Sequence, residues 1–427
     1  MTRKRILFIS PHVPFPPTDG GMVRTYSLVK AFSRDWEIHF IAIKNLTDAR
    51  SQSNGFKVSE IFPNLILKTC LVENGPNLVE MLRSNTWTKV FVELRDALKR
   101  NEFSNILFTI LNFPYKLALI YRKYQRARRF VRDYLSRTTF DAVLFDYTKM
   151  AHYSTIIADR SVRTILNAHN AESDLSRQIL NSLSGFEWIH GWLRWQLHRK
   201  FERYFVPKCD FILASSDADA KFHKNLSKQI RTIIVPNAVD TDDLRPLPPP
   251  EEPLSLIYPG RMDYPPNSEA VEFFCREILP KLARIVPGVR LYVVGKNPPP
   301  RIRELQSDTV EITGYVENMI PFWRKAAILV APLQSGSGTR IKILEAMALG
   351  RPVVSTGKGC EGLDLTHGKA ILIADDAATF VRETVRLLQD PVLYRQLVIH
   401  TRILVEECYS FRAVEQLIDK AFHSNAF

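Results

Sequence analysis

The chain has 427 residues, of which 45% are hydrophobic and 24% are charged. This globular composition excludes a disordered chain, a collagen-like fibre and a small disulfide-stapled scaffold. The net charge of +13 resides in one half, because residues 1–240 contain 36 basic and 22 acidic side chains whereas residues 241–427 contain 22 and 23. This asymmetry indicates a polyanionic partner, such as nucleic acid, an acidic membrane surface or an anionic substrate.

The cysteines and the N-terminal residues indicate a cytoplasmic protein. Five scattered cysteines without a C-x-x-C pair favour reduced thiols and offer no zinc site. The basic start of the chain precedes an apolar run that is too short for a signal peptide. No stretch reaches about 18 uninterrupted apolar residues, so we expect no membrane-spanning helix.

Apolar runs alternate with helical patterns in the first half of the chain. Runs rich in Ile, Val, Leu and Phe predict buried parallel strands at residues 5–10, 37–43, 142–146, 163–168, 210–215 and 232–235. A proline-rich stretch from Pro246 to Pro253 follows. It can continue neither a helix nor a central strand, so it marks a linker between domains.

The second half repeats the alternation. Strands are predicted at residues 254–258, 289–294, 310–313, 328–331, 352–355 and 370–374. Between the first two strands we expect a helix that begins with Asn267 as its cap. Its apolar side chains recur with helical spacing at Val271, Phe274, Ile278 and Leu282.

Alternating strands and helices in both halves predict an α/β fold with two doubly wound, Rossmann-like parallel sheets. We expect domains at residues 1–240 and 241–404, followed by a C-terminal helix in residues 405–427. Ligands of such sheets bind beyond the carboxyl ends of the strands. Two sheets that face each other would form a ligand-binding cleft between the domains.

The most informative segment is residues 332–355, in which a glycine-rich loop lies between a strand and a helix expected to begin near Thr339. The loop contains Gly336, Ser337 and Gly338. Backbone amides at a helix N-terminus are suited to phosphate, and a bound anion would explain why Arg340 and Lys342 stand there. Glu345 could accept hydrogen bonds from a ribose diol. Spacing alone also allows an ordinary turn and an amphipathic helix.

Two other segments place glycines after a predicted strand. Arg261 follows Gly260, so its side chain should point into the cleft, although a solvated arginine is the alternative. The pair Gly20-Gly21 begins a helix and permits close approach of the backbone to a substrate, although a flexible turn is the alternative. His12, at the end of the preceding strand, fits a structural role better than a catalytic one.

A fourth segment contains His169, which also follows a predicted strand. Its imidazole could donate a hydrogen bond to a sugar hydroxyl or transfer a proton, and Glu172 could orient it or cap the next helix. Two Asp-x-Asp pairs, Asp217 with Asp219 and Asp240 with Asp242, resemble metal ligands. We assign the first pair to a helix start and the second to the linker.

Together these segments resemble the retaining glycosyltransferases of the GT-B fold, of the family 4 type, also described as group 1 sugar transferases. The resemblance covers nearly the whole chain. Its most specific part is GSGTRIKILEAMALGRPVVS, which is followed by residues 359–363. The other matching segments are Gly20-Gly21 with Arg24, His169-Asn170, Glu202 ahead of the strand at 210–215, and residues 235–240 and 260–267.

The resemblance implies that the second domain holds a nucleotide-diphosphate sugar, a co-substrate rather than a cofactor. In catalysis, Arg261 and Lys342 would compensate the diphosphate and His169 would touch the transferred sugar. The donor-binding residues would be Gly20, Gly21, Gly260, Tyr315, Val316, Gly336, Ser337, Gly338, Thr339, Arg340 and Glu345, the last at the ribose. The first domain would bind the acceptor through Arg24, His12 and Glu172, and the last helix, 405–422, would cross back onto it.

The sequence departs from the family pattern in three places. The family usually has two glutamates with seven residues between them, and counting back from Glu345 reaches Ser337. The lysine that often follows the Gly-Arg pair is absent from residues 263–265, and Ala238 replaces the glycine of Asn-Gly-Val-Asp. Arg340 and Lys342 could supply the missing charge.

In the implied reaction, negative charge grows on the departing diphosphate and is stabilised by cations, loop amides and the helix dipole. A metal would then be unnecessary, and the anomeric configuration would be retained. The acceptor would be a glycan or a lipid-linked sugar, in polysaccharide or glycolipid biosynthesis. Aromatic and basic side chains in residues 105–135 and 186–205 suit a peripheral position on an anionic membrane, with core-packed helices as the alternative.

Two other functions stay open. A sugar-nucleotide 2-epimerase of the same fold would convert the donor without any acceptor. A non-catalytic binder of membrane or nucleic acid would suit the positive charge, but it leaves the glycine loops and Glu345 unexplained, so we expect no nucleic-acid partner.

Overall fold

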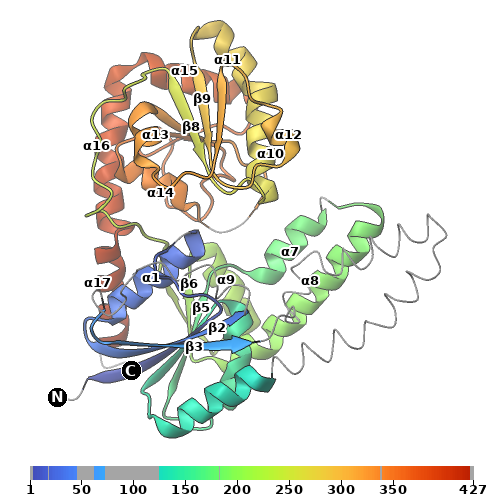
Figure 1. Cartoon of the computed structure of the whole chain (residues 1–427), viewed down its shortest axis with the longest axis vertical. Coiled ribbons are helices and arrows are strands. Elements are labelled where there is room, and N and C mark those ends of the chain that lie inside the picture. The colour runs from blue at the N-terminus through green and yellow to red at the C-terminus, as the bar shows by residue number, and fades with distance from the viewer. Residues whose placement is uncertain are drawn as a thin grey trace. The chain divides into compact units, whose positions relative to one another are not determined.

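The computed structural model describes residues 3–17, 19–45, 62–72, 125–181, 183–336 and 339–423. The chain divides into two compact units, Met1–Ile234 and Val235–Phe427, each built around its own sheet (Figure 1). The segment just before the proposed linker groups with the second unit. It does so because the Val239 amide donates to the Tyr409 carbonyl at 2.8 Å and the Phe411 amide donates to the Val239 carbonyl at 3.1 Å.

The first unit contains a seven-stranded parallel sheet in the order β3-β2-β1-β4-β5-β6-β7. Its strands are β1 (Lys4–Ser10), β2 (Trp36–Asn45), β3 (Leu65–Val72), β4 (Ala142–Asp146), β5 (Arg163–Ala168), β6 (Phe211–Ala214) and β7 (Arg231–Ile234). Its helices are α1 (Gly20–Phe32), a helix at residues 125–137, the 3-10 helices η1 (Thr148–Ile156) and η2 (Val206–Lys208), α7 (Glu172–Asn181), α8 (Gly185–Phe205) and α9 (Asp217–Leu226).

The second unit contains a six-stranded parallel sheet in the order β10-β9-β8-β11-β12-β13. Its strands are β8 (Ser255–Pro259), β9 (Arg290–Val294), β10 (Val310–Gly314), β11 (Ile328–Ala331), β12 (Val353–Ser355) and β13 (Leu372–Ile373). Its helices are α10 (Pro265–Phe273), the π-helical turn η3 (Phe274–Ile278), α11 (Leu279–Ile285), α12 (Pro300–Arg303), α13 (Ile320–Lys325), α14 (Ile341–Ala348), α15 (Ala377–Gln389), α16 (Pro391–Cys408) and α17 (Phe411–His423).

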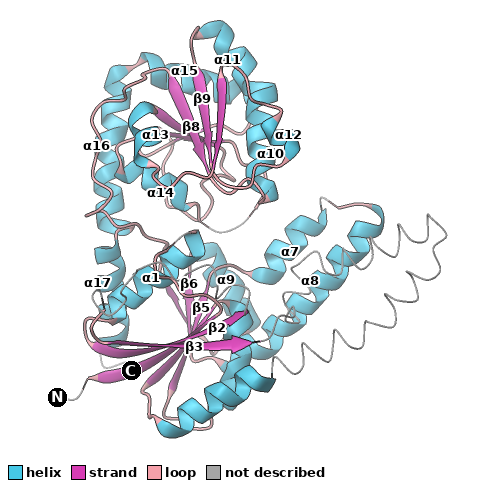
Figure 2. Ribbon diagram, in the orientation of Figure 1, coloured by secondary structure: helices cyan, strands magenta, loops and turns pink. Residues whose placement is uncertain are grey.

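The predicted fold class is confirmed, since both sheets are parallel and their strands lie between helices (Figure 2). All twelve predicted strands form, with ends shifted by no more than two residues. The strand that the prediction missed is β3, at the edge of the first sheet. Its side chains are only partly buried, with Ile66 and Lys68 exposed, so it lacks the continuous apolar run that marks the buried strands.

The strand order reverses direction in both sheets. In the first unit β1 pairs with β2 on one side and β4 on the other, and in the second unit β8 lies between β9 and β11. Chain connections leave such a switch point in opposite directions, which opens a crevice at the carboxyl ends of the strands. Each unit therefore has one favoured position for a ligand.

Three details of the helices differ from the prediction. Asn267 is not the cap of the helix after β8, because α10 begins at Pro265 and Tyr264 is its N-cap. The expected apolar face is buried, but the helix is interrupted by the π-helical turn η3. The chain also ends in two helices, α16 and α17, where one was expected. The return of the last helix to the first domain stays a prediction.

All five cysteines are free thiols, as predicted. Among the described residues, no helix combines the length and the apolarity needed to cross a bilayer.

Two arginines, the buried Arg351 and the partly buried Arg402, hold the proline-rich linker against the second unit. The Arg351 guanidinium, 2% exposed, donates to the carbonyls of Trp323 and Pro248 at 2.9 Å each. The Arg402 guanidinium donates to the carbonyls of Leu244 and Ala348 at 2.6 and 2.9 Å. A guanidinium has five donors in a fixed plane, so it can satisfy several carbonyls that a proline-rich segment leaves unpaired.

We expect Arg351→Met to destabilise the protein. Its methylene stem is retained, but buried carbonyls lose a charged donor, which costs about 2–4 kcal/mol. The measurement is the free energy of unfolding in urea. The matched control is Arg301→Met, at an exposed arginine, for which we expect less than about 0.5 kcal/mol. Equal losses in both variants would contradict the assigned role of Arg351.

Candidate active site

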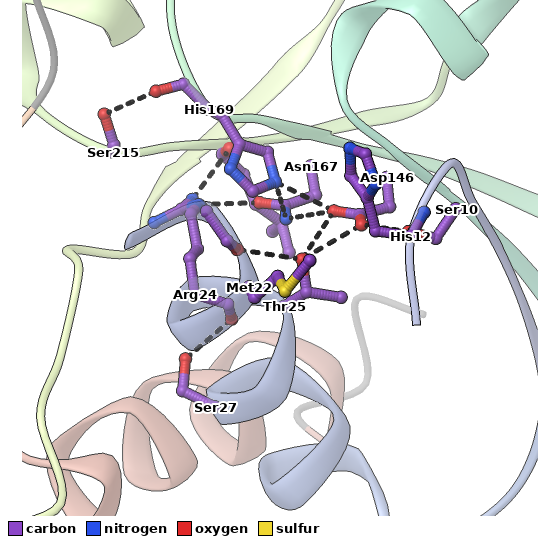
Figure 3. Close-up of polar contacts among 12 residues, drawn as sticks. Ser10, His12, Met22, Arg24, Thr25, Ser27, Asp146, Asn167, His169 and Ser215 are labelled. Carbon is purple, nitrogen blue, oxygen red and sulfur yellow. Dashed lines mark hydrogen bonds and ion pairs between the residues drawn. The ribbon is translucent and has the colours of Figure 1, made fainter. Parts of the chain in front are cut away.

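The first candidate site lies at the carboxyl ends of β1, β4 and β5, beside the start of α1 (Figure 3). Polar side chains end each strand and meet there, and we call them the Asp146 network. Its members are Ser10 from β1, Arg24 and Thr25 from α1, Asp146 from β4, Asn167 from β5, and His169 just after β5. All six are buried, with at most 8% of the surface of any of them exposed.

The Asp146 carboxylate is fully buried and accepts hydrogen bonds from four side chains (Figure 3). The donors are Ser10 Oγ at 2.7 Å, Thr25 Oγ1 at 2.9 Å, Asn167 Nδ2 at 2.9 Å and His169 Nε2 at 2.8 Å. Burial acts to raise the pKa of Asp146, but His169 and the other donors outweigh it and the net pKa is lowered. The carboxylate is therefore ionised and fully satisfied at neutral pH.

Arg24 completes the network from α1. Its Nε donates to Asn167 Oδ1 at 2.8 Å and its Nη2 to the Leu213 carbonyl at 3.2 Å. Burial lowers the pKa of Arg24 to about 10, against the opposing effect of the Asp219 and Asp146 carboxylates. The side chain is thus engaged inside the unit, and its expected role toward the acceptor stays a prediction.

An aromatic ring fixes the orientation of His169. Tyr147 stacks on the imidazole with a centroid separation of 3.6 Å and an interplanar angle of 3°. Its φ of 69° is a left-handed conformation that a tyrosine rarely adopts. The Gly20-Gly21 pair begins α1, with Asp19 as the N-cap, and a Cβ on Gly21 would stand 2.1 Å from the Tyr147 hydroxyl oxygen. Gly21 is therefore required for this close packing.

His12 and Glu172 lie at the margin of this network. The His12 ring meets the Tyr147 ring edge-on at 5.8 Å, and its amide donates to Ser10 Oγ at 3.2 Å. Glu172 is the first residue of α7. The cap is the buried Glu202 of α8, whose carboxylate accepts from the amides of Glu172 and Ser173 at 2.8 and 3.2 Å.

The second candidate site lies at the carboxyl ends of β8 and β11, beside the start of α14. We call its central residues the Lys342 cluster, which consists of Tyr258, Gly260, Arg261, Asn267 and Lys342. Gly260 is needed for this packing, because a Cβ there would lie 2.9 Å from Asn267 Nδ2 and 3.0 Å from Lys342 Nζ. The Asn267 amide donates to the Arg261 carbonyl at 2.8 Å.

The Lys342 ammonium is held in a partly buried position. Its Nζ donates to Asn267 Oδ1 at 3.0 Å and lies 3.9 Å from the centroid of the Tyr258 ring. Burial lowers the pKa of Lys342, and Arg340 lowers it further while Glu345 raises it. Burial raises the pKa of Glu345, and Lys342 opposes that rise. The cations outnumber the carboxylates at this point, which suits an anionic ligand.

Arg261 and Arg340 flank the Lys342 cluster. The Arg261 guanidinium is half-exposed and forms an ion pair with Asp263 at 2.8 Å. The α14 helix begins at Ile341, two residues later than expected, and Arg340 is its N-cap residue. The Arg340 Nη2 donates to the Ser335 carbonyl at 3.4 Å and lies beside Gly336, where a Cβ would be 2.8 Å away from it.

The other residues predicted for the donor site lie in the glycine loop before α14 and after β10. Thr339 is buried and accepts a hydrogen bond from Asn237 Nδ2. Ser337 and Gly338 lie outside the described residues. Tyr315 follows β10 and is 68% exposed, with Lys296 Nζ 6.0 Å from its ring centroid, and Val316 is half-buried. An exposed aromatic ring at a strand end is available to stack on a planar base.

The structure thus gathers the predicted residues into two groups, one in each unit. His12, Gly20, Gly21, Arg24, His169 and Glu172 lie around the Asp146 network, whereas Gly260, Arg261, Gly336, Thr339, Arg340, Lys342 and Glu345 lie around the Lys342 cluster. Prediction missed Asp146, Thr25, Tyr147 and Asn267 as site residues. Asp146 ends a predicted strand, so the rule that ligands bind at carboxyl ends could have found it.

Within the described part of the chain, no group of three or more His, Cys, Asp or Glu side chains is placed to hold a metal ion. The Asp217 and Asp219 pair lies in the first turn of α9, behind the N-cap Ser216, as we assigned it.

Comparison with known proteins shows the family. A sequence profile described as glycosyl transferases group 1 matches residues 253–390, and one described as Glycosyltransferase Family 4 matches residues 77–243. Together they span more than two-thirds of the chain. The protein therefore belongs to the group 1, family 4 glycosyltransferases.

Relatives and solved structures agree with that family. The phosphatidyl-myo-inositol mannosyltransferase of Mycolicibacterium smegmatis is 28% identical over 170 residues, which cover 37% of this chain and 43% of that protein. The first three curated relatives are each matched over less than half of their length.

Two solved structures resemble nearly the whole chain. The sucrose-phosphate synthase of Thermosynechococcus elongatus has a TM-score of 0.69 at 16% identity, covering 99% of this chain and 98% of that one. Anabaena HepE, solved with UDP and glucose, has a TM-score of 0.61 at 12% identity, covering 99% and 100%. At these identities the likeness shows the fold alone, which is that of the GT-B enzymes.

The buried Glu202 carboxyl should make the free energy of unfolding depend on pH. Burial raises the pKa of Glu202 to about 7 from an ordinary value of 4.5. The folded chain therefore holds a proton that the unfolded chain releases, so stability is lost as pH rises from about 4.5 to about 7. We expect a loss of about 3 kcal/mol across this window, at 1.36 kcal/mol per pH unit.

The measurement is the free energy of unfolding in urea at a series of pH values. Glu202→Gln keeps an acceptor for the α7 amides but cannot ionise, so its difference from the native protein should change across that window. Glu304→Gln, at an exposed glutamate, is the control and should follow the native profile. A pH profile of Glu202→Gln that runs parallel to the native one would refute the assignment.

Proposed function

We propose that this protein transfers a sugar from a nucleotide-diphosphate donor to a glycan or lipid-linked acceptor, with retention of the anomeric configuration. The observation that carries this proposal is the Lys342 cluster, which places cations at the carboxyl ends of β8 and β11 beside the N-terminus of α14. Anionic groups bind where backbone amides, a helix dipole and cationic side chains converge.

The relatives support the chemical class of substrate. HepE is described in complex with UDP and glucose, and the mycobacterial relative is described as a mannosyltransferase acting on phosphatidyl-myo-inositol. By that analogy the donor here is a nucleotide-diphosphate sugar and the acceptor a glycolipid or polysaccharide precursor.

We assign separate roles to the residues of the donor site. Lys342 and Arg261 stabilise the charge that develops on the leaving diphosphate, and Glu345 accepts hydrogen bonds from the ribose. The Glu345 carboxylate has no hydrogen-bond partner among the described residues, so it is available for this role. Tyr315 and Val316 meet the base. These cations make a metal unnecessary, so we propose a metal-independent transfer.

Arg340 compensates for the missing lysine of the Gly-Arg segment. A Cβ on Gly336 would lie 2.8 Å from Arg340 Nη2 and 3.3 Å from Pro266, so the guanidinium is close to the start of α10, where that lysine is absent. The cation thus comes from a different segment of the chain.

We also propose that the protein binds an anionic membrane surface that carries the acceptor. Two segments of the chain are candidates for that contact. In the helix at residues 125–137, Phe130, Tyr134 and Leu135 pack against the core, so this helix offers only a basic outer face. Residues 105–124 lie outside the described part of the chain. The α8 helix differs, because it exposes apolar side chains: Trp188, Trp192, Leu193, Leu197 and Tyr204.

Basic side chains accompany this apolar face of α8. Lys200, Arg203 and Lys208 are exposed, and the Lys208 ammonium lies 3.7 Å from the centroid of the Tyr204 ring. Aromatic rings flanked by cations suit the interface of a bilayer that contains acidic lipids. We therefore propose α8 as the membrane-facing element of a peripheral protein at the cytoplasmic face.

Product analysis tests the reaction. The protein is incubated with UDP-glucose, UDP-N-acetylglucosamine or GDP-mannose, with and without a lipid fraction as the acceptor source, and sugars are followed by NMR. We expect release of nucleoside diphosphate that the lipid fraction stimulates, and a product with the donor's anomeric configuration. Conversion of a donor to its C2 epimer without the lipid fraction would instead establish the epimerase alternative.

Substitution of a lysine in the Lys342 cluster tests whether the reaction takes place there. Lys342→Ala should lower kcat/KM about 100-fold, as expected when one transition-state donor is removed. Lys369→Ala, at an exposed lysine, should leave it unchanged. Equal activity of the two variants would contradict the role of Lys342.

Flotation on vesicles of phosphatidylglycerol tests the role of α8. Trp192→Ser with Leu197→Ser should weaken binding about tenfold or more, since two exposed apolar side chains that would insert into the bilayer are lost. Ile403→Ser, at an exposed isoleucine of α16, is the control. No binding of the native protein, or equal weakening by the control, would contradict the proposal.

A further inference from the structure

The two ring nitrogens of His169 have different surroundings. Its Nε2 lies 2.8 Å from Asp146 Oδ1 and 3.1 Å from Asn167 Nδ2. Its Nδ1 forms no hydrogen bond with any described residue, although the side chain is only 8% exposed. The imidazole therefore has one nitrogen committed to the interior and one nitrogen left for a ligand.

The orientation of the Asn167 amide is set by Arg24. An arginine Nε can only donate, so the atom that it meets at 2.8 Å is the amide oxygen. The Asn167 nitrogen, which carries only donor hydrogens, consequently faces Asp146 and His169. It donates to Asp146 Oδ1 at 2.9 Å.

These contacts decide where the imidazole proton lies. The Asp146 carboxylate is surrounded by donors and is ionised, so it can only accept. A separation of 2.8 Å between two acceptors would be repulsive, and His169 Nε2 must therefore carry the proton. The Asn167 nitrogen, 3.1 Å from Nε2, is also a donor and by itself would favour a bare Nε2. The contact with the ionised carboxylate is shorter and charge-assisted, so it outweighs the amide and keeps the proton on Nε2.

We propose that Asp146 is a positioning residue that holds His169 as the neutral Nε2–H tautomer and so presents the Nδ1 lone pair to the substrate. His169 then accepts a hydrogen bond from a substrate hydroxyl, where the sequence had suggested an imidazole that donates. The identification of that hydroxyl as one on a sugar rests on the proposed function. An ether or carbonyl oxygen at the same place would meet a lone pair and be disfavoured.

The surroundings favour a neutral ring in a fixed orientation. Burial lowers the pKa of His169, and Arg24 adds to this effect, against the opposing charges of Asp146 and Glu172. The stacked Tyr147 ring covers one face of the imidazole at 3.6 Å. A ring flipped by 180° would turn a carbon toward Asp146 and remove one of the donors to its carboxylate. The network thus selects both the orientation and the tautomer.

Nitrogen NMR of the ligand-free full chain, with ¹⁵N-labelled histidine, tests the proposal. His169→Gln identifies the resonances by their disappearance. We expect Nε2 to resonate as a protonated nitrogen and Nδ1 as an unprotonated one at neutral pH. A protonated Nδ1, alone or together with a protonated Nε2, would overturn the proposal. This readout needs no substrate, so it stands or falls independently of the proposed sugar transfer.

Two variants test the part played by Asp146. Asp146→Asn removes the charge that holds the Nε2 proton, so both tautomers should be populated. Asp141→Asn changes an exposed aspartate immediately before the same strand and should leave the spectrum unchanged. An unaltered spectrum in Asp146→Asn would show that Asp146 does not set the tautomer. If that variant fails to fold, the native spectrum still decides the tautomer.

Discussion

The constraint on which the first unit depends is the need to satisfy one buried carboxylate. Asp146 is fully buried, and an ionised carboxylate without donors would be prohibitively costly there. Its donors come from β1, from α1 and from the end of β5 (Figure 3). The same contacts therefore set the positions of the start of α1, with its Gly20-Gly21 pair, and of His169. In this unit the Asp146 network therefore both stabilises the fold and positions the side chains of the proposed chemistry.

The second unit shows the opposite electrostatic arrangement. Lys342 is partly buried and contacts a neutral amide and an aromatic ring, while Glu345 stands nearby without a hydrogen bond to a described residue. Partial burial of the Lys342 ammonium beside only an amide and an aromatic ring is unfavourable unless a ligand supplies negative charge. Binding of a diphosphate would remove that cost, which is why this cluster supports the proposed function. A bound diphosphate would also explain why Arg340 and Lys342 stand at the N-terminus of α14.

Much of the fold could be predicted from the sequence, because buried parallel strands are continuous apolar runs. The edge strand β3 escaped detection because it is half-exposed and mixes Lys68 and Thr69 with apolar residues. Glycine loops and basic residues indicated the Lys342 cluster. The Asp146 network could not be read as a unit, since Arg24, Asp146 and Asn167 are far apart in the sequence and look like ordinary strand-end or helix residues. Tyr147 and Asn267 were missed because their roles depend on packing.

The most direct test of the account is thermal stabilisation of the full chain by UDP, GDP, ADP, CMP and dTDP. A ligand that binds only the folded state raises the melting temperature, with about 2.7 kcal/mol gained at a hundredfold excess over Kd. We predict stabilisation by one nucleoside diphosphate that is lost in Lys342→Ala and Glu345→Ala and kept in Lys369→Ala. Stabilisation that persists in the first two variants, or none with any nucleotide, would contradict a nucleotide-sugar site at the Lys342 cluster.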